Sequence, residues 1–221
     1  MKYSIAIDGP AGAGKSTIAK ELAKKLGYIY VDTGAMYRAM ALYFLRLGLC
    51  ADQHAAIAES CKNVRVAIEY LEGVQQIILN GENVTAFLRE EEVGRMASAT
   101  SIYPEVRMKL VELQRALAAE EDVIMDGRDI GTYVLPNANV KIYLTASVET
   151  RANRRYLELK EKGIESNYEE IKKDIEERDY RDKNREFAPL LQAEDAVLLD
   201  TSDMTVEEVI NSILTIKEKA K

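Results

Sequence analysis

A glycine-rich segment near the amino terminus limits the folds open to this chain more than any other feature. Residues 9–16 read GPAGAGKS and match the pattern GxxxxGKS at every required position. An apolar run at 3–8 precedes this segment, and residues 16–26 repeat apolar side chains at helical spacing. The sequence therefore predicts a strand, a phosphate-binding loop and a helix in direct succession.

Each residue type in this loop suits the binding of a nucleotide phosphate. Glycines let the backbone fold with successive amides pointing inward, and the helix that follows directs its positive end to the same place. Lys15 can reach the β and γ phosphates, and the hydroxyl of Ser16 can bind Mg²⁺. The alternative, a flexible glycine turn before an ordinary helix, is disfavoured by the flanking strand and helix. We expect an ATP site at Gly9, Pro10, Ala11, Gly12, Ala13, Gly14, Lys15, Ser16 and Thr17.

Strand-like and helical segments alternate along most of the chain. Further apolar runs typical of strands lie at 28–31, 122–125, 140–144 and 196–199. The alternation predicts an α/β fold of three layers, with a central five-stranded parallel sheet and helices on both faces. Two runs at 64–70 and 75–79, with a turn between them, predict a small antiparallel insertion.

Charge and cysteine content exclude several classes of partner. A net charge of −7 disfavours binding to nucleic acid polymers and anionic membranes. No segment approaches the roughly 20 apolar residues of a membrane span, and the start of the chain does not read as a signal peptide. Cys50 and Cys61 stand alone, without the spacing of a zinc site. We expect a cytoplasmic protein, by default a monomer, and its arginine clusters at 151–155 and 178–185 suit small anions.

Three classes of P-loop protein are compatible with the loop: a GTPase switch, a motor or transport ATPase, and a small-molecule kinase. No NKxD guanine motif occurs, and the 221 residues are few for a motor. A second set of anion-binding residues favours a kinase with a second phosphorylated substrate.

Four motifs narrow the kinase class further: IDGPAGAGKST at 7–17, VDTGAMYR at 31–38, DGRDIGT at 126–132 and ERDYRDKNR at 177–185. In this order and at these separations they resemble the bacterial cytidylate kinases, within the nucleoside monophosphate kinase family of P-loop proteins. The resemblance runs from about Tyr3 to the last helix. It implies transfer of the γ-phosphoryl group of ATP to CMP or dCMP, with Mg²⁺ as cofactor, in pyrimidine nucleotide metabolism.

The resemblance also implies an organisation and a set of site residues. The chain is expected to be one domain, with a core at about 1–34, 100–150 and 186–221, an acceptor-binding insertion at 35–99 and a helical lid at 151–185. Lys15, Arg128 and Arg178 would be catalytic, Arg151, Arg154 and Arg155 would belong to the lid, and Arg154 would bind ATP. The substrate would be bound by Thr33, Tyr37, Arg38, Ser98, Arg107, Asp126, Gly127, Arg128, Asp129, Arg178, Asp182 and Arg185.

Cytosine offers an amino donor and two acceptors, so a carboxylate at Asp129 and a guanidinium at Arg107 could recognise it. Less specific interpretations stay open for several residues. Asp32 could hold a water on Mg²⁺ or simply cap a helix, and Arg128 could form a structural ion pair with a neighbouring aspartate. The arginines at 178, 181 and 185 could form one binding face of a helix or a solvated charged surface. A kinase for UMP or a purine nucleotide and a nucleotide-sensing module are the alternative functions.

Overall fold

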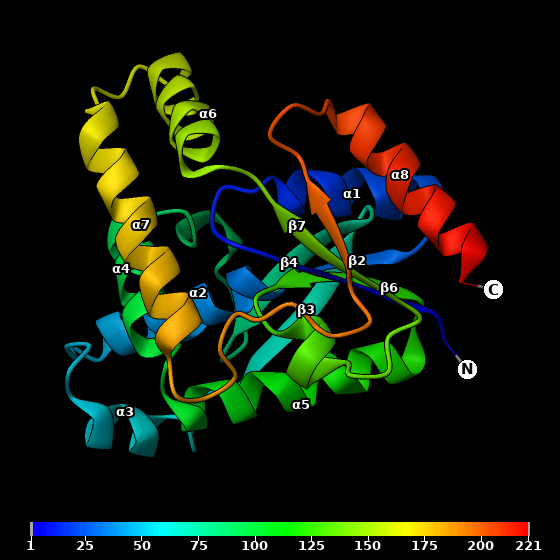
Figure 1. The fold of residues 1–221 in the computed structure, drawn as a ribbon. Helices are drawn as coiled ribbons and strands as arrows, with labels where there is room; N and C mark the ends of the chain where they lie inside the picture. Colours follow the sequence, from blue (N-terminus) through cyan, green and yellow to red (C-terminus); the bar gives the residue numbers. More distant parts are fainter. Residues whose placement is uncertain (1, 221) are drawn as a thin grey trace.

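A five-stranded parallel sheet forms the centre of the fold in the computed structural model, which describes residues 2–220 (Figure 1). The strands lie in the order β2-β6-β1-β7-β8, so successive strands are joined by crossover connections. Their bounds are β1 (Ser4–Asp8), β2 (Ile29–Asp32), β6 (Val123–Gly127), β7 (Val140–Thr145) and β8 (Val197–Asp200). The predicted central sheet is confirmed, with strand ends within two residues of those expected.

Helices cover both faces of this sheet, as the sequence predicted. The α-helices of the described chain are α1 (Lys15–Leu26), α2 (Thr33–Arg46), α3 (His54–Ser60), α4 (Glu91–Thr100), α5 (Pro104–Glu120), α6 (Val148–Glu161), α7 (Tyr168–Asn184) and α8 (Val206–Lys219). No helix within residues 2–220 is both long and apolar enough to cross a membrane.

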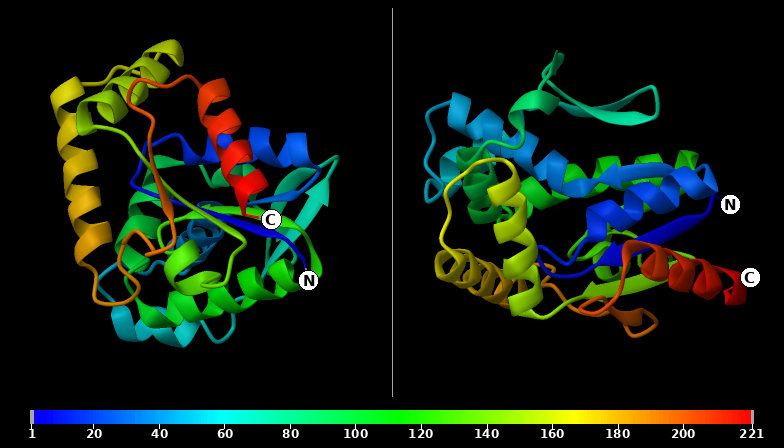
Figure 2. Two further views of the ribbon diagram at one scale, coloured as in Figure 1. Left: turned by 45° about the vertical axis from the view of Figure 1, so that its right-hand side comes forward. Right: turned by 90° about the horizontal axis from the view of Figure 1, so that it is seen from above.

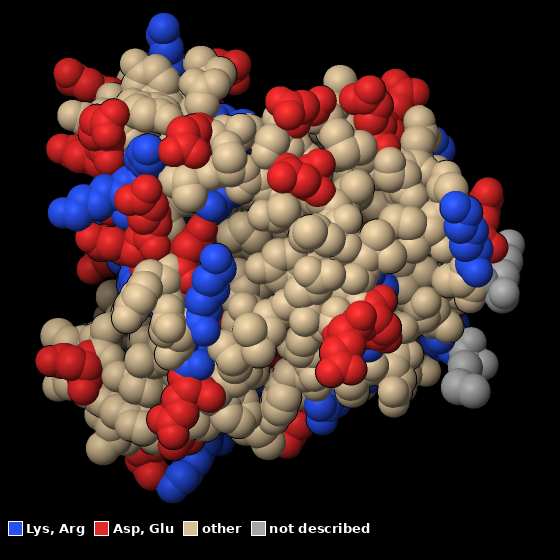
Figure 3. Space-filling model, viewed as in Figure 1, with Lys and Arg blue, Asp and Glu red and all other residues tan. Residues whose placement is uncertain are grey.

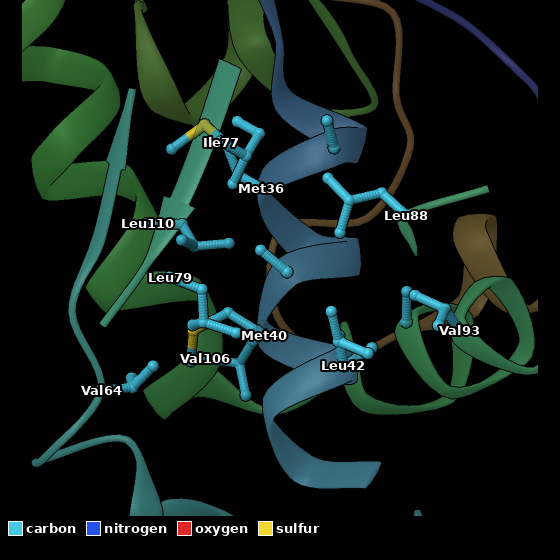
Figure 4. Packing of buried hydrophobic residues seen from close by; sticks show 14 of the residues in the cluster. Met36, Met40, Leu42, Val64, Ile77, Leu79, Leu88, Val93, Val106 and Leu110 are labelled. Atoms are coloured by element: carbon cyan, nitrogen blue, oxygen red, sulfur yellow. The ribbon is translucent and has the colours of Figure 1, made fainter. Parts of the chain in front are cut away.

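Side-chain alternation along β1 divides the core into two clusters. Ile5 and Ile7 pack with α1 and α8 on one face, whereas Ala6, between them, points to the other face. Figure 4 shows that second cluster, where Met36 and Met40 of α2 pack near strand β4 (Val74–Leu79) and helix α5. Burial on both faces explains why the central strands read as continuous apolar runs in the sequence.

The predicted antiparallel insertion is also confirmed, and it contains three strands. These are β3 (Val66–Leu71), β4 (Val74–Leu79) and the short β5 (Glu82–Asn83). Two-residue turns at Glu72-Gly73 and Asn80-Gly81 join them, and all four turn residues have positive φ. This is the geometry that right-twisted hairpins prefer, which explains the glycine at each second position.

Helices α6 and α7 form an antiparallel pair at one side of the sheet (Figures 1 and 2). The pair corresponds to the segment expected to act as a lid, and this role stays a prediction. Acidic and basic side chains crowd together over this pair, whereas the middle of the same face is largely uncharged (Figure 3). Many of these charges form ion pairs between successive helical turns, such as Lys162 with Glu158.

The carboxyl ends of three neighbouring strands bring the sequence motifs together. Asp8, at the end of β1, is in register with Gly127 of β6, and Asp32 of β2 is in register with Asp126. The phosphate-binding loop therefore begins beside the DGRD segment and beside the start of α2. A parallel sheet places its ligand site at this edge.

Candidate active site

One cavity of about 300 Å³ at the carboxyl edge of the sheet collects most of the residues expected to bind nucleotides. We call it the main cavity. Of the expected site residues, it is lined by Ala11, Gly12, Lys15, Ser16, Thr33, Tyr37, Arg38, Ser98, Arg107, Asp126, Gly127, Arg128, Asp129, Arg178, Asp182 and Arg185. These residues come from five separate parts of the chain, so their meeting in one space is a strong indication of a ligand site.

The phosphate-binding loop wraps around the buried ammonium group of Lys15. Its backbone has φ values of 148°, 76° and 89° at Gly9, Gly12 and Gly14, where any other residue would be strained. Lys15 Nζ donates to the carbonyl oxygen of Pro10 at 2.7 Å. The loop thus closes on its own lysine, and an incoming phosphate would take over this hydrogen bond.

The positive charges around Lys15 favour the binding of an anion in the main cavity. Burial lowers the pKa of Lys15 well below its usual range, and repulsion from Arg128 and Arg178 lowers it further. Asp126 opposes this shift by attraction. Phosphate oxygens between these cations would relieve the repulsion and form charge-assisted hydrogen bonds.

Ser16 and Asp126 form a pair of oxygen ligands beside the loop. Ser16 Oγ donates to Asp126 Oδ2 at 2.9 Å, and the hydroxyl of Tyr30 donates to Asp126 Oδ1 at 2.9 Å. Burial raises the pKa of Asp126, and the charge of Asp32 raises it further. A cation at this carboxylate would remove that cost, and one hydroxyl with one carboxylate suits Mg²⁺, which takes its other ligands from phosphates and water. Residues 2–220 contain no cluster of three metal-ligating side chains of the His, Cys, Asp or Glu types.

Asp32, at the start of α2, lines the main cavity and makes contacts of its own there. Asp32 Oδ1 accepts from the backbone N–H of Ala35 at 2.8 Å, which makes Asp32 the N-cap of α2. Its Oδ2 accepts from Arg38 Nη2 at 3.2 Å. Capping of α2 is therefore confirmed for Asp32, and its water-mediated role toward Mg²⁺ stays a prediction. Thr33 Oγ1 donates to the carbonyl oxygen of Asp126 at 2.6 Å and so joins α2 to β6.

A buried carboxylate between two arginines lies at the acceptor end of the main cavity. Asp129, only 4% exposed, accepts from Arg107 through Oδ2 and from Arg185 Nη2 through Oδ1, the latter at 3.3 Å. The Arg107 guanidinium lies 5.5 Å from the ring centre of Tyr37 and 5.8 Å from that of Phe187. This group can present both acceptors and donors to a flat polar ring.

Arg128 joins the DGRD segment to α7. Its Nε donates to Asp182 Oδ2 at 2.7 Å, and although burial raises the pKa of Asp182, Arg128 lowers it overall. The interpretation of Arg128 as the ion-pair partner of a neighbouring aspartate is wrong, because its partner lies 54 residues away. Arg178 lines the main cavity, but Arg181 points into solvent and α7 ends at Asn184. The expected three-arginine helical face is therefore wrong at Arg181.

The three arginines expected in the lid have different positions. Arg151 is buried, and its guanidinium donates to the carbonyl oxygens of Ala146 and Ala11, both at 2.9 Å, and to Asp179 Oδ2 at 2.6 Å. It packs behind the phosphate-binding loop and braces it, and its expected role of closing over ATP stays a prediction. Arg155 pairs with Glu158 at the surface.

Arg154 borders a second, smaller hollow of about 160 Å³ on the other side of the phosphate-binding loop. Arg154 Nη2 donates to the carbonyl oxygen of Thr201 at 2.7 Å. The hollow is lined by Ala13, Gly14, Thr17, Ile18, Arg154, Thr201, Met204, Val206 and Val209. Its apolar wall suits the flat ring of a nucleotide base. The sequence motifs did not indicate Thr201 or Met204, because they follow β8 in a segment without a recognisable pattern.

Sequence reasoning also missed Asp8, the residue before the phosphate-binding loop. Its carboxylate accepts from the backbone N–H of Ile130 at 2.8 Å and from that of Gly131 at 2.7 Å. These amides directly follow Asp129. One buried carboxylate therefore fixes the loop next to Gly9 and the loop that carries Asp129 relative to each other.

The free energy of unfolding should depend on pH because Asp8 is buried. Burial raises its pKa from 3.8 to about 6, although the two amide hydrogen bonds oppose the shift. Between these values the unfolded chain loses the Asp8 proton and the native protein keeps it, so native stability falls as pH rises. Relative to Asp8→Asn, wild type should lose up to about 3 kcal/mol of unfolding free energy between pH 4 and pH 7. Urea unfolding of both proteins measures this; a constant difference would contradict the shift.

Gln114 is another buried polar residue that the motifs did not indicate. It lies on α5, lines the main cavity and is 1% exposed, and its Oε1 has no hydrogen-bond partner within the described chain. Its signal in the sequence is a polar residue on the apolar side of α5, seven positions after Arg107. Two helical turns place both side chains on the same side of the helix.

Comparisons with known proteins give the relatives of this chain. A family model described as cytidylate kinase matches residues 5–219. The cytidylate kinase of Caldicellulosiruptor saccharolyticus is 53% identical over 213 residues, which cover 96% of this chain and 94% of that protein. The cytidylate kinase of an Exiguobacterium species is 49% identical over 223 residues and covers 100% of both chains.

Solved structures with lower identity share the fold. An uncharacterized protein from Eubacterium ventriosum aligns with a TM-score of 0.54 at 12% identity, covering 98% of this chain and 99% of that one. Shikimate kinase from Acinetobacter baumannii, solved in complex with shikimate, aligns with a TM-score of 0.50 at 15% identity, covering 100% and 96%. These two likenesses show a shared fold and carry no information on the activity or substrate of this chain.

Proposed function

This chain belongs to the cytidylate kinase family, and we propose that it transfers the γ-phosphoryl group of ATP to CMP or dCMP through the residues of the main cavity. The products are ADP and CDP or dCDP. The observation that carries the proposal is that Lys15 shares one cavity with Arg38, Arg128 and Arg178. These cations can hold the phosphates of a donor and an acceptor in the same space.

The donor nucleotide is held by the phosphate-binding loop. The backbone N–H groups of residues 11–16 and the amino end of α1 surround its phosphates, and Lys15 leaves Pro10 to bind the γ phosphate. Ser16 and Asp126 are the residues that would hold Mg²⁺, which when bound neutralises charge on the β and γ phosphates. The apolar hollow beside Arg154 accommodates the base of ATP.

The acceptor nucleotide occupies the opposite end of the main cavity. Arg38, Arg128 and Arg178 bind its phosphate, while Asp182 and Tyr37 lie along the ribose. Ser98, Arg107 and Asp129 surround the base. An oxygen of the acceptor phosphate attacks the γ phosphorus as the bond to the bridging oxygen breaks and ADP leaves. That oxygen is already anionic, so alignment and charge stabilisation suffice and no side chain has to act as a general base.

A panel of acceptors tests the substrate. The purified protein is mixed with ATP, Mg²⁺ and one of CMP, dCMP, UMP, AMP or GMP, and the diphosphate products are separated and quantified. We expect CDP and dCDP to form fastest. If UMP, AMP or GMP is instead phosphorylated fastest, the protein is a kinase for that nucleoside monophosphate. Binding of nucleotides without any diphosphate product would indicate a sensing module instead.

We also propose that the reaction takes place in the cytoplasm and that a monomer suffices for it, as part of pyrimidine nucleotide metabolism. Cys50 and Cys61 are both free thiols in the fold, which suits a reducing compartment. Residues of a single chain line the main cavity and the apolar hollow. Gel filtration of the active protein, with light scattering, checks the monomer.

A further inference from the structure

Gln75 of the antiparallel insertion binds the backbone of Asp32 at the edge of the site. Gln75 Oε1 accepts from the backbone N–H of Asp32 at 2.8 Å, and its Nε2 donates to the carbonyl oxygen of Asp32 at 3.3 Å. Asp32 ends β2, which is an edge strand of the central sheet. The amide of Gln75 therefore satisfies both backbone groups that an adjoining strand would otherwise bind.

The same residue, Asp32, holds an arginine of the main cavity. Its carboxylate caps α2 at Ala35 and accepts from Arg38 Nη2 at 3.5 Å and 3.2 Å. Within residues 2–220, these are the hydrogen bonds that the Arg38 side chain makes, and its Nε is buried without a partner. The direction of the Arg38 guanidinium therefore depends on where the Asp32 backbone is fixed.

The antiparallel insertion makes few other hydrogen bonds to β2 that could fix Asp32. The hydroxyl of Tyr70 on β3 donates to the carbonyl oxygen of Tyr30 at 3.1 Å, which is the hairpin's other hydrogen bond to β2 in the described chain. A cleft of about 760 Å³ separates the rest of the hairpin from α1 and β2. Buried Ile77 and Leu79 pack the hairpin against the core beneath α2, whereas Gln75 and Tyr70 supply its hydrogen bonds to the β2 backbone among the described residues.

We propose that Gln75 is a positioning residue for the acceptor substrate: its amide fixes Asp32, and Asp32 in turn aims Arg38 at the phosphate of the nucleoside monophosphate. Gln75 does not line the main cavity and so acts without touching the substrate. The antiparallel insertion then serves as a brace for the acceptor side of the site. This inference rests on the proposed function only in assigning the acceptor phosphate to Arg38.

The next residue provides a matched control. Gln76 lies on the same strand with its side chain on the opposite face, where Oε1 accepts from Asn83 Nδ2 at 3.1 Å and Nε2 donates to the carbonyl oxygen of Val74 at 3.4 Å. Both hydrogen bonds of the Gln76 side-chain amide are made within the three-stranded sheet. Removing the Gln76 amide thus weakens the hairpin itself without releasing Asp32.

The first test compares Gln75→Ala with Gln76→Ala in steady-state kinetics. We expect Gln75→Ala to raise KM for CMP about tenfold, because two hydrogen bonds that orient Asp32 are lost. KM for ATP should stay within twofold, and thermal unfolding should match that of Gln76→Ala. The Gln76→Ala variant should keep the wild-type KM for CMP. An equal rise for both variants, or an equal rise in the two KM values of Gln75→Ala, would overturn the inference.

A double-mutant cycle tests whether the effect passes through Arg38. In an Arg38→Ala background, whose own KM for CMP is already raised, adding Gln75→Ala should change that KM less than twofold. A further tenfold rise there would show that Gln75 acts by another route. The proposed function fails separately: a wild-type protein that does not phosphorylate CMP overturns that proposal, whereas normal turnover with an unchanged KM in Gln75→Ala overturns only this one.

Discussion

Lys15→Ala should lower kcat for CMP phosphorylation by about 10³ to 10⁵-fold, the range found when a cation at a transferring phosphoryl group is removed. Lys15 is the residue of the phosphate-binding loop whose charge is buried, and its Nζ is already held within the loop by the carbonyl oxygen of Pro10. The γ-phosphoryl group spreads negative charge over its oxygens in the transition state. The ammonium group therefore stabilises the transition state more than the ground state, and its loss lowers kcat.

The same substitution should leave the unliganded fold intact. Burial and two arginines oppose the charge of Lys15, so its removal relieves an electrostatic cost and should not lower Tm. Lys24→Ala, on the exposed side of α1, is the matched control and should keep wild-type kcat. A coupled assay of ADP release measures both variants. Wild-type turnover in Lys15→Ala, or a loss of turnover explained by unfolding, would contradict the assigned role.

The parts of the site that the sequence predicted are those with local causes. The glycines at 9, 12 and 14 adopt positive φ because the loop itself requires it, and Lys15 follows as the first residue of a helix. The central strands are apolar on both faces, so short apolar runs predicted their positions. The motif residues then gathered at one edge because parallel strands end there.

The direction of each charged side chain could not be predicted, because its partner is distant in the sequence. Arg151 turns behind the loop to reach Asp179, on the neighbouring helix, and Arg128 reaches Asp182 instead of an adjacent aspartate. Periodicity placed Arg181 with the binding arginines, yet the packing of α7 exposes it. The direction of a charged side chain depends on which buried charge it must pair with, and tertiary contacts decide which charges are buried together.

Polar residues without a motif were missed for a related reason. Asp8, Gln75 and Gln114 each act through backbone groups or a cavity wall that only the folded chain brings together. Asp8 stands at the end of an apolar strand, where a carboxylate is unusual, and that was the one available signal. Gln75 lies in an alternating strand, where a glutamine on one face is ordinary.

Asp129→Asn should reduce the preference for CMP over UMP by about 10³-fold, measured as the ratio of the two kcat/KM values. A carboxylate offers only acceptors, which match the exocyclic amino group of cytosine and repel the O4 of uracil. An asparagine of the same shape can turn its NH₂ toward O4 and accept UMP. The burial of Asp129 makes this discrimination large, because an unmatched polar group there cannot be compensated by water.

The ratio of kcat/KM for CMP to kcat/KM for UMP is not affected by a loss of stability in the variant. Asparagine leaves Arg107 and Arg185 facing each other with less opposing charge, so the variant should unfold more easily by about 3 kcal/mol. A smaller folded fraction lowers both kcat/KM values equally and cancels in their ratio. The matched control is Asp195→Asn, where an exposed carboxylate pairs with Lys141; neither residue lines the main cavity, and the ratio should not change. If both variants keep the wild-type preference, the base is read elsewhere in the main cavity, and the unpaired Oε1 of Gln114 becomes the acceptor to test next.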